Sequence, residues 1–234
     1  MKSLVFDTGS IISLAMNNLL WVLKPLKKKF NGDFLLPLGV KYELIDRPLN
    51  INRFKLDAVV IRDYLMEGVF KMVSSNEIDK KSKYLLDLAN SVYFAKDKPI
   101  KIVQKAEMDA ISLVLHYGSG ALVMDERTLR LLIEDPEGLG EVLTRRLRTK
   151  IRIDKDTLNR FRNEAGKVNI IRSTELVVVA YDLGIMDKYI SVGKKVHNEF
   201  RKDMLSGALW GLKYKGCAIS VNEIKEILRL KNLK

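Results

Sequence analysis

The sequence predicts an α/β fold built on a parallel β-sheet. Short runs of strand-forming residues alternate with segments of helical periodicity along most of the 234 residues, a pattern typical of parallel sheets covered by helices. Two of these runs end in a carboxylate, at Asp7 and at Asp125. Because the carboxyl ends of parallel strands line a common crevice, both residues are expected at one edge of the sheet.

The first thirty residues predict a strand and two helices. The run Lys2–Asp7 indicates a buried strand, and Thr8–Ser10 indicates a turn and a helix N-cap. Apolar residues then keep a helical period up to residue 30, but an asparagine pair at 17–18 and Pro25 interrupt it. Two short helices therefore fit this segment better than one long helix.

The alternation continues to residue 125. A strand at Phe34–Pro37 precedes a helix over Val40–Arg47, which stops before Pro48 and carries Glu43. The further expected helices are Phe54–Met66, Ile78–Phe94 and Val103–His116, and the further strands are Val69–Val73 and Ala121–Asp125.

The second part of the chain predicts one more strand and several helices. The strand is expected at Val168–Ile171, with helices at Ser173–Leu183 and Met204–Lys213, and a capping box at Ser220–Glu223 opens a last amphipathic helix. We therefore expect one domain over residues 1–234, in which 136–167 is a basic insertion and 168–234 adds the last strand and extra C-terminal helices.

Basic residues outnumber acidic ones by 41 to 29, which gives a net charge of +12 and makes a polyanion the expected partner. Residues 145–167 alone hold nine basic and three acidic side chains. This segment is either a phosphate-tracking arm or a solvated helix or hairpin, and we favour the first. The RNA-binding candidates are Arg145, Arg146, Arg148, Lys150, Arg152, Arg160 and Arg162.

Several classes of protein are excluded. The single cysteine, Cys217, cannot form an internal disulfide, and two histidines do not complete a structural zinc site. The longest stretch without a charged residue, Thr8–Leu23, has 16 residues, which is shorter than the roughly 20 that a membrane helix needs. Because no signal peptide is evident, we expect a cytoplasmic protein without a membrane partner.

Four carboxylates occupy positions suited to a divalent cation. Asp7 and Asp125 end strands, Glu43 lies on a helix after a strand, and Asp109 lies near the start of the helix from Val103. Such oxygen clusters bind Mg²⁺ or Mn²⁺. Glu107 and Asp109 point to nearly opposite sides of a regular helix, and of the two we favour Asp109.

The same residues carry a family resemblance. The chain resembles the PIN-domain family of metal-dependent ribonucleases in the order, separation and structural setting of four segments, over residues 1–135 and more loosely over 168–228. These segments are Val5–Ser10 (VFDTGS), Leu38–Leu44 (LGVKYEL), Ala106–Val114 (AEMDAISLV) and Leu122–Arg127 (LVMDER). The resemblance implies an α/β/α sandwich.

The resemblance also implies a function and a site. Asp7, Glu43, Asp109 and Asp125 would surround one or two Mg²⁺ or Mn²⁺ ions, and RNA would be cut by water to leave 5′-phosphate and 3′-hydroxyl ends. Family members often dimerise, so a homodimer is considered, whereas the sequence names no antitoxin or other protein partner. The supporting residues are Thr8, Ser10, Glu107, Glu126 and Ser173.

The chain departs from the family pattern in ways that keep other functions open. It is longer than many PIN toxins, it lacks the cysteines of a zinc ribbon, and Met124 stands where many members carry a small polar residue. The alternatives are a catalytically inactive PIN-fold protein that binds RNA or acts as a scaffold, and a structure-specific DNA nuclease.

Overall fold

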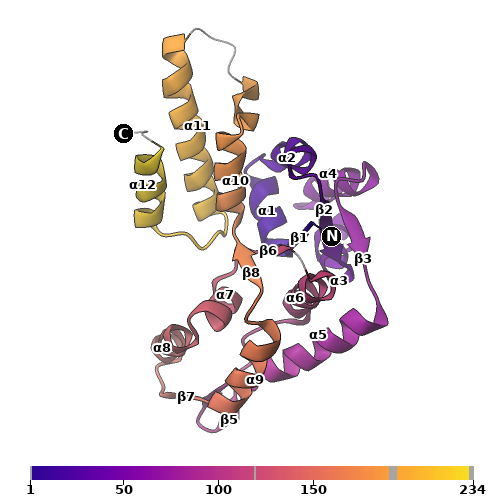
Figure 1. Ribbon diagram of the computed structural model, residues 1–234, viewed down its shortest axis with the longest axis vertical. Helices are drawn as coiled ribbons and strands as arrows, with labels where there is room; N and C mark the ends of the chain where they lie inside the picture. Colours follow the sequence, from indigo (N-terminus) through magenta and orange to yellow (C-terminus); the bar gives the residue numbers. More distant parts are fainter. Residues whose placement is uncertain (1, 119, 190–193, 232–234) are drawn as a thin grey trace.

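The computed structural model describes residues 2–118, 120–189 and 194–231. Within them, five parallel strands form one sheet in the order β3-β2-β1-β6-β8 (Figure 1). The strands are β1 (Ser3–Phe6), β2 (Asp33–Pro37), β3 (Lys71–Val73), β6 (Ala121–Val123) and β8 (Asn169–Ile171). The predicted α/β fold with a parallel sheet is confirmed.

The central strand β1 is buried along its whole length. Leu4 and Phe6 belong to one hydrophobic cluster and Val5 belongs to the other, because successive side chains of a strand point to opposite faces of the sheet. Helices cover both faces. This double coverage explains why β1 is a nearly continuous apolar run rather than an alternating one.

Two sets of helices pack on the two faces of the sheet. None of them, within the described ranges, combines the length and apolar character that a membrane span requires. The cluster with Leu4 and Phe6 includes residues of α1 (Thr8–Met16), α2 (Leu23–Phe30), α4 (Lys55–Met66), α10 (Ser173–Asp182), α11 (Lys194–Tyr214) and α12 (Val221–Leu230). The cluster with Val5 includes residues of α5 (Asn76–Ala89), α6 (Lys105–Tyr117), α7 (Arg127–Glu134), α8 (Pro136–Leu147) and α9 (Lys155–Ala165).

The helix expected from Val40 is confirmed, with an irregular course. It begins as α3 (Leu38–Lys41), widens into the π-helical turn η2 (Tyr42–Asp46) and ends before the 3-10 helix η3 (Pro48–Asn50). The ring of Pro48 cannot continue a regular helix, which accounts for the end. Widened turns of this kind often occur at functional sites, and this one carries Glu43.

The helix expected over Ile78–Phe94 is wrong at its C-terminal end. The helix α5 stops at Ala89, and the side-chain oxygen of Asn90 accepts hydrogen bonds from the backbone N–H groups of Ile102 (2.7 Å) and Val103 (3.1 Å). These bonds join the end of α5 to the segment that precedes α6. The residues that follow form a short strand, β4 (Tyr93–Ala95), whose aromatic residues had continued the helical period.

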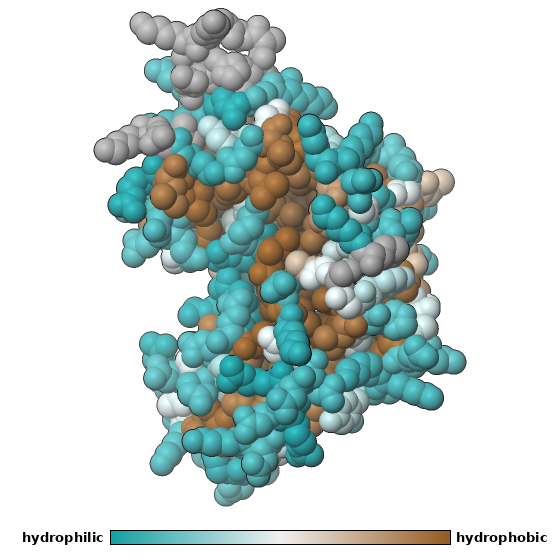
Figure 2. Space-filling view, viewed as in Figure 1, coloured by the Kyte–Doolittle hydropathy of each residue, from teal (hydrophilic) through white to brown (hydrophobic). Residues whose placement is uncertain are grey.

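Residues 136–167 form two helices around a strand, β7 (Ile151–Ile153), which pairs with β4 in a small antiparallel sheet completed by β5 (Lys98–Pro99). The buried Tyr93 hydroxyl donates to the Pro136 carbonyl at 2.8 Å. Phe161 on α9 is fully buried in the cluster that contains Val5. This segment is therefore part of the folded core, and its outer side is hydrophilic (lower part of Figure 2).

The C-terminal helices α11 and α12 lie at the opposite end of the molecule from α8 and α9 (Figure 1). The capping box predicted for the last helix is confirmed: the Ser220 hydroxyl accepts from the Glu223 N–H at 3.1 Å, and the Glu223 carboxylate accepts from the Ser220 N–H at 2.8 Å. The predicted end of α10 near Gly184 is also confirmed, because Gly184 has a φ of +70°.

The burial of Phe161 predicts that residues 136–167 unfold together with the sheet. We expect Phe161→Ala to lower the free energy of unfolding by about 3–5 kcal/mol, because it leaves a cavity beneath α9. Urea denaturation measures this change. The neighbouring exposed Arg162→Ala is the control and should alter stability by less than about 0.5 kcal/mol. Equal stabilities for the two variants would contradict the packing.

Candidate carboxylate site

Asp7 lies at the end of the central strand, next to the end of β6. Its backbone N–H donates to the Val123 carbonyl at 3.0 Å, and its carboxylate caps α1 by accepting from the Gly9 N–H at 3.1 Å. The Ser10 hydroxyl donates to the carbonyls of Asp7 (2.9 Å) and Val123 (3.1 Å) and holds the two strand ends together. The aspartate is thus fixed at the carboxyl edge of the sheet, as predicted.

The electrostatic surroundings of Asp7 disfavour its charge. The pKa of Asp7 is raised to about 6, mainly by burial and to a smaller extent by the nearby carboxylates of Glu43 and Asp125, whereas hydrogen bonds from the Gly9 and Thr8 backbone lower it. Glu43 approaches from η2 and accepts a hydrogen bond from the Thr8 hydroxyl at 2.6 Å. Asp7, Thr8 and Glu43 therefore form one connected group.

The two acidic residues at the start of α6 face different surroundings. Glu107 accepts from the Gln104 N–H at 2.6 Å, and burial raises its pKa to about 7, with further contributions from Glu126, Asp7 and Glu43. Glu107 therefore lies close enough to Glu126, Asp7 and Glu43 for their negative charges to act on it. It was expected only to support the site.

Asp109, which was expected to be a ligand, has partners of its own. Lys105 donates to its two carboxylate oxygens at 2.9 and 3.2 Å, and the Ser82 hydroxyl donates to Oδ1. Gly39 lies so close that a Cβ there would be 3.2 Å from Oδ2. The cation neutralises Asp109, whereas no described cation forms an ion pair with Asp7, Glu43 or Glu107.

Asp125 and Glu126 both act as helix caps in this structure. The buried Asp125 carboxylate accepts from the Ser173 N–H at 2.8 Å and from the Ser173 hydroxyl at 2.7 Å, so it holds the N-terminus of α10. Glu126 accepts from the Leu129 N–H at 2.8 Å and caps α7. The last strand, β8, pairs with β6, and Ser173 directly after it reaches the carboxylate edge.

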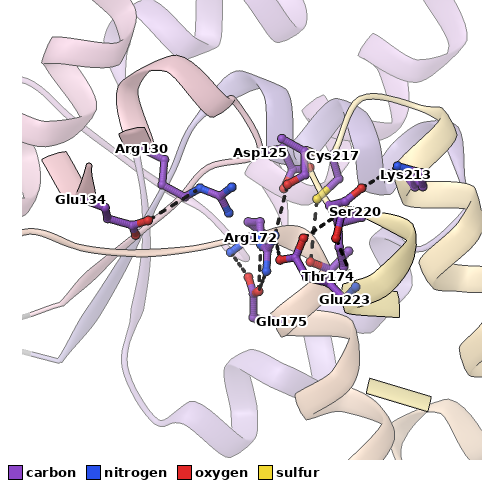
Figure 3. Close-up of polar contacts among 12 residues, drawn as sticks. Asp125, Arg130, Glu134, Arg172, Thr174, Glu175, Lys213, Cys217, Ser220 and Glu223 are labelled. Atoms are coloured by element: carbon purple, nitrogen blue, oxygen red, sulfur yellow. Dashed lines mark hydrogen bonds and ion pairs between the residues drawn. The ribbon is translucent and has the colours of Figure 1, made fainter. Parts of the chain in front are cut away.

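A second polar group supports Asp125 from the C-terminal helices (Figure 3). Arg172 forms ion pairs with Glu175 and with Glu223, the latter at 2.8 Å, and donates to the Ala218 carbonyl at 3.1 Å. The Ala218 N–H in turn donates to the Asp125 carbonyl at 3.1 Å. The capping box at Ser220 indicated a helix, but no local pattern announced that the residues before it contact Asp125.

The candidate RNA-binding residues lie away from this edge of the sheet, on α8, β7, α9 and the turns between them. All seven are exposed, and within the described part of the chain none forms an ion pair. The guanidinium of Arg152 stacks over the Phe94 ring, 4.3 Å from its centre. The remaining members, Arg145, Arg146, Arg148, Lys150, Arg160 and Arg162, present their charge to solvent.

The donor set suits a hard divalent cation by its chemistry. Asp7, Glu43, Glu107 and Glu126 supply carboxylate oxygens, and the pKa of Glu107 shows that these carboxylates act on one another. Within residues 2–118, 120–189 and 194–231, however, no three Asp, Glu, His or Cys side chains lie close enough together to hold one ion in the arrangement shown.

Comparisons with known proteins do not extend this picture. The sequence matches no family model, and neither the curated proteins nor the solved structures contain a match to the chain.

The raised pKa of Asp7 predicts a pH-dependent cost to the fold. The carboxylate ionises near pH 3.8 in the unfolded chain and near pH 6 in the folded one, so the folded state loses relative stability between these values and stays weakened above them. In EDTA at pH 8, Asp7→Asn should therefore be more stable than the parent by up to about 3 kcal/mol. The difference should vanish below pH 4. Thermal unfolding against pH measures it, and a less stable variant at pH 8 would contradict the burial effect.

Proposed function

We propose that the chain is a Mg²⁺- or Mn²⁺-dependent endoribonuclease with a PIN-like fold. The observation that carries the proposal is the group of carboxylates at the carboxyl edge of β1 and β6, where Asp7 and Glu107 have raised pKa values and no described lysine or arginine forms an ion pair with them. Gathering like charges in a buried place weakens a fold, and such arrangements are concentrated at functional sites. A divalent cation would relieve this repulsion.

The residues that would hold the cation are Asp7, Glu43 and Glu107, with Glu126 as a further oxygen donor. When bound, such a cation lowers the pKa of a water molecule and offsets negative charge on the phosphate that is attacked. The Thr8 hydroxyl keeps the Glu43 carboxylate in place through its 2.6 Å hydrogen bond. Asp125 orients this edge by holding α10, and Asp109 fixes α6 against α5 through Ser82.

RNA is the proposed substrate because the chain carries +12 and exposes a basic surface on α8, β7 and α9. Lysines and arginines on such a surface bind a single strand by displacing its counterions. The products would carry 5′-phosphate and 3′-hydroxyl ends, as the resemblance to PIN ribonucleases implies. An inactive RNA-binding protein with the same fold would show the binding without the cleavage.

Cleavage of end-labelled RNA should depend on a divalent cation and on two carboxylates. We expect the parent chain to cut in Mn²⁺ or Mg²⁺ and not in EDTA, whereas Asp7→Asn and Glu107→Gln should lose at least a hundredfold in rate while keeping their fold and RNA affinity. Glu77→Gln is the matched control, because its side chain is 82% exposed on α5. A DNA strand of the same sequence tests whether ribose is required.

Comparison of Glu107→Gln with Asp109→Asn tests the assignment within α6. Asp109→Asn should keep measurable cleavage, since its carboxylate is paired with Lys105. Full activity in Glu107→Gln together with loss in Asp109→Asn would return the ligand role to Asp109. Unchanged binding without cleavage by any chain would favour the inactive RNA-binding protein.

The basic surface predicts a strong salt dependence of RNA binding. Replacing Arg145, Arg146 and Arg148 by glutamine should lower the slope of log affinity against log salt by about 2, since each phosphate contact to a single strand contributes roughly 0.7. Affinities measured at several salt concentrations give this slope. The exposed lysines Lys28 and Lys29 on α2 are the control pair, and a slope that falls equally in both variants would show only a general charge effect.

A further inference from the structure

A cavity of about 470 Å³ adjoins the carboxylate group on the side of α4. Its walls come from α1, η2, η3 and the start of α4, and they are mainly apolar, with Ile12, Met16, Ile51 and Phe54 each partly exposed. Cavities of roughly 300–1,000 Å³ with apolar walls and a few polar groups are typical of ligand sites. The carboxylate mechanism described above does not use this cavity.

The polar groups of the cavity are arranged around its apolar walls. Glu43 forms part of the lining, so the cavity begins where the carboxylate group ends. Arg47, Arg53 and Asp57 also line it. The two arginine side chains are exposed, and the guanidinium of Arg53 stands over the Phe54 ring, 5.3 Å from its centre. One aromatic ring and two guanidinium groups therefore line the same cavity as Glu43, one of the residues proposed to hold the cation.

We propose that this cavity binds one unpaired nucleobase of the RNA next to the phosphate that is cut. This inference rests on the proposed ribonuclease function, and it specifies which part of the RNA the cavity binds. Unstacked bases bind proteins by stacking on aromatic rings and on arginine planes and by hydrogen bonds along their edges. Phe54 supplies the ring, the apolar walls hold the faces of the base, and Arg47 and Arg53 donate to its edge or to the adjoining phosphate.

Charge favours a nucleotide over an apolar protein segment as the occupant. The exposed Arg47 and Arg53 attract the phosphate backbone, whereas the carboxylates of Glu43 and Asp57 in the lining repel a phosphate from the cavity itself, so that an uncharged base enters while its phosphates stay outside. The chain's net charge of +12 also disfavours a second copy at this position. A base is planar and apolar on both faces, which suits the mainly apolar walls.

The proposal is tested by RNA binding without cleavage. All chains carry Asp7→Asn, EDTA is present, and the probe is a labelled single-stranded oligoribonucleotide in which each position in turn is made abasic. For the chain with Asp7→Asn alone, called the parent in this experiment, we expect one abasic position to weaken binding about tenfold. This is the loss of affinity expected when one base no longer stacks on an aromatic ring. Phe54→Ala should weaken binding of the intact strand to the same extent and should no longer respond to the abasic position.

Matched variants separate stacking from damage to the fold. Phe54→Trp should keep the affinity and Phe54→Leu should lose it, although leucine preserves apolar volume, and thermal unfolding checks that each variant folds. Tyr84→Ala is the control, because Tyr84 is an exposed aromatic residue on α5 with Lys81 over its ring, outside the cavity. Its affinity should equal that of the parent.

Several results would overturn the base-binding cavity. Absence of RNA binding, or equal loss at every abasic position in both the parent and Phe54→Ala, excludes a dedicated subsite. If Met16→Lys changes the oligomeric state in sedimentation without changing RNA affinity, the cavity is an interface between copies. Cleavage is measured separately, so the two proposals can fail independently. If the chain cuts RNA but Phe54→Ala does not change RNA binding, only the base-binding cavity is contradicted. If binding depends on Phe54 but the chain never cuts RNA, only the ribonuclease proposal is contradicted.

Discussion

The structure depends on the burial of β1 on both faces of the sheet. A strand with helices packed on both sides has no exposed face, so polar side chains are placed where the strand ends. Asp7 stands at that point, 5% exposed and bonded to the start of α1. The helical segments that carry Glu43 and Glu107 meet the end of β6, which carries Asp125, at the same edge. Burial and the repulsion among these carboxylates raise the pKa of Asp7 and Glu107.

Much of the fold could be predicted because the decisive signals are local. The apolar run that ends in Asp7, the interruption at Asn17–Asn18 and the capping box at Ser220 each act within a few residues, and each structure follows the prediction. The helix over Ile78–Phe94 failed at its end because the deciding bonds join Asn90 to residues 102 and 103. Helical periodicity holds no information about a partner so far along the chain.

The sequence predicted where Asp7, Glu43 and Asp125 lie in the fold, whereas the choice of carboxylates that would bind a cation stays a prediction. Strand ends located Asp7 and Asp125, and the helix after β2 located Glu43. The choice between Glu107 and Asp109 depends on Lys105 and Ser82, of which Ser82 comes from a different helix. In the same way, Ser173 turns the Asp125 carboxylate into the cap of α10, although the two residues are 48 positions apart. The partners of these carboxylates are set by how the helices pack, which cannot be predicted from local sequence patterns.

The bonds around Asp125 also bear on when the carboxylate edge forms during folding. The carboxylate edge joins residues from Asp7 to Ala218, so its formation requires the closure of very long loops, which is slow compared with the formation of single helices. A partly folded chain can contain β1 and α1 without Ser173 or Ala218 in place. Such an intermediate has the acidic residues but not their arrangement. Under the proposed function, catalytic competence therefore appears late in folding, and incompletely folded molecules do not cut RNA.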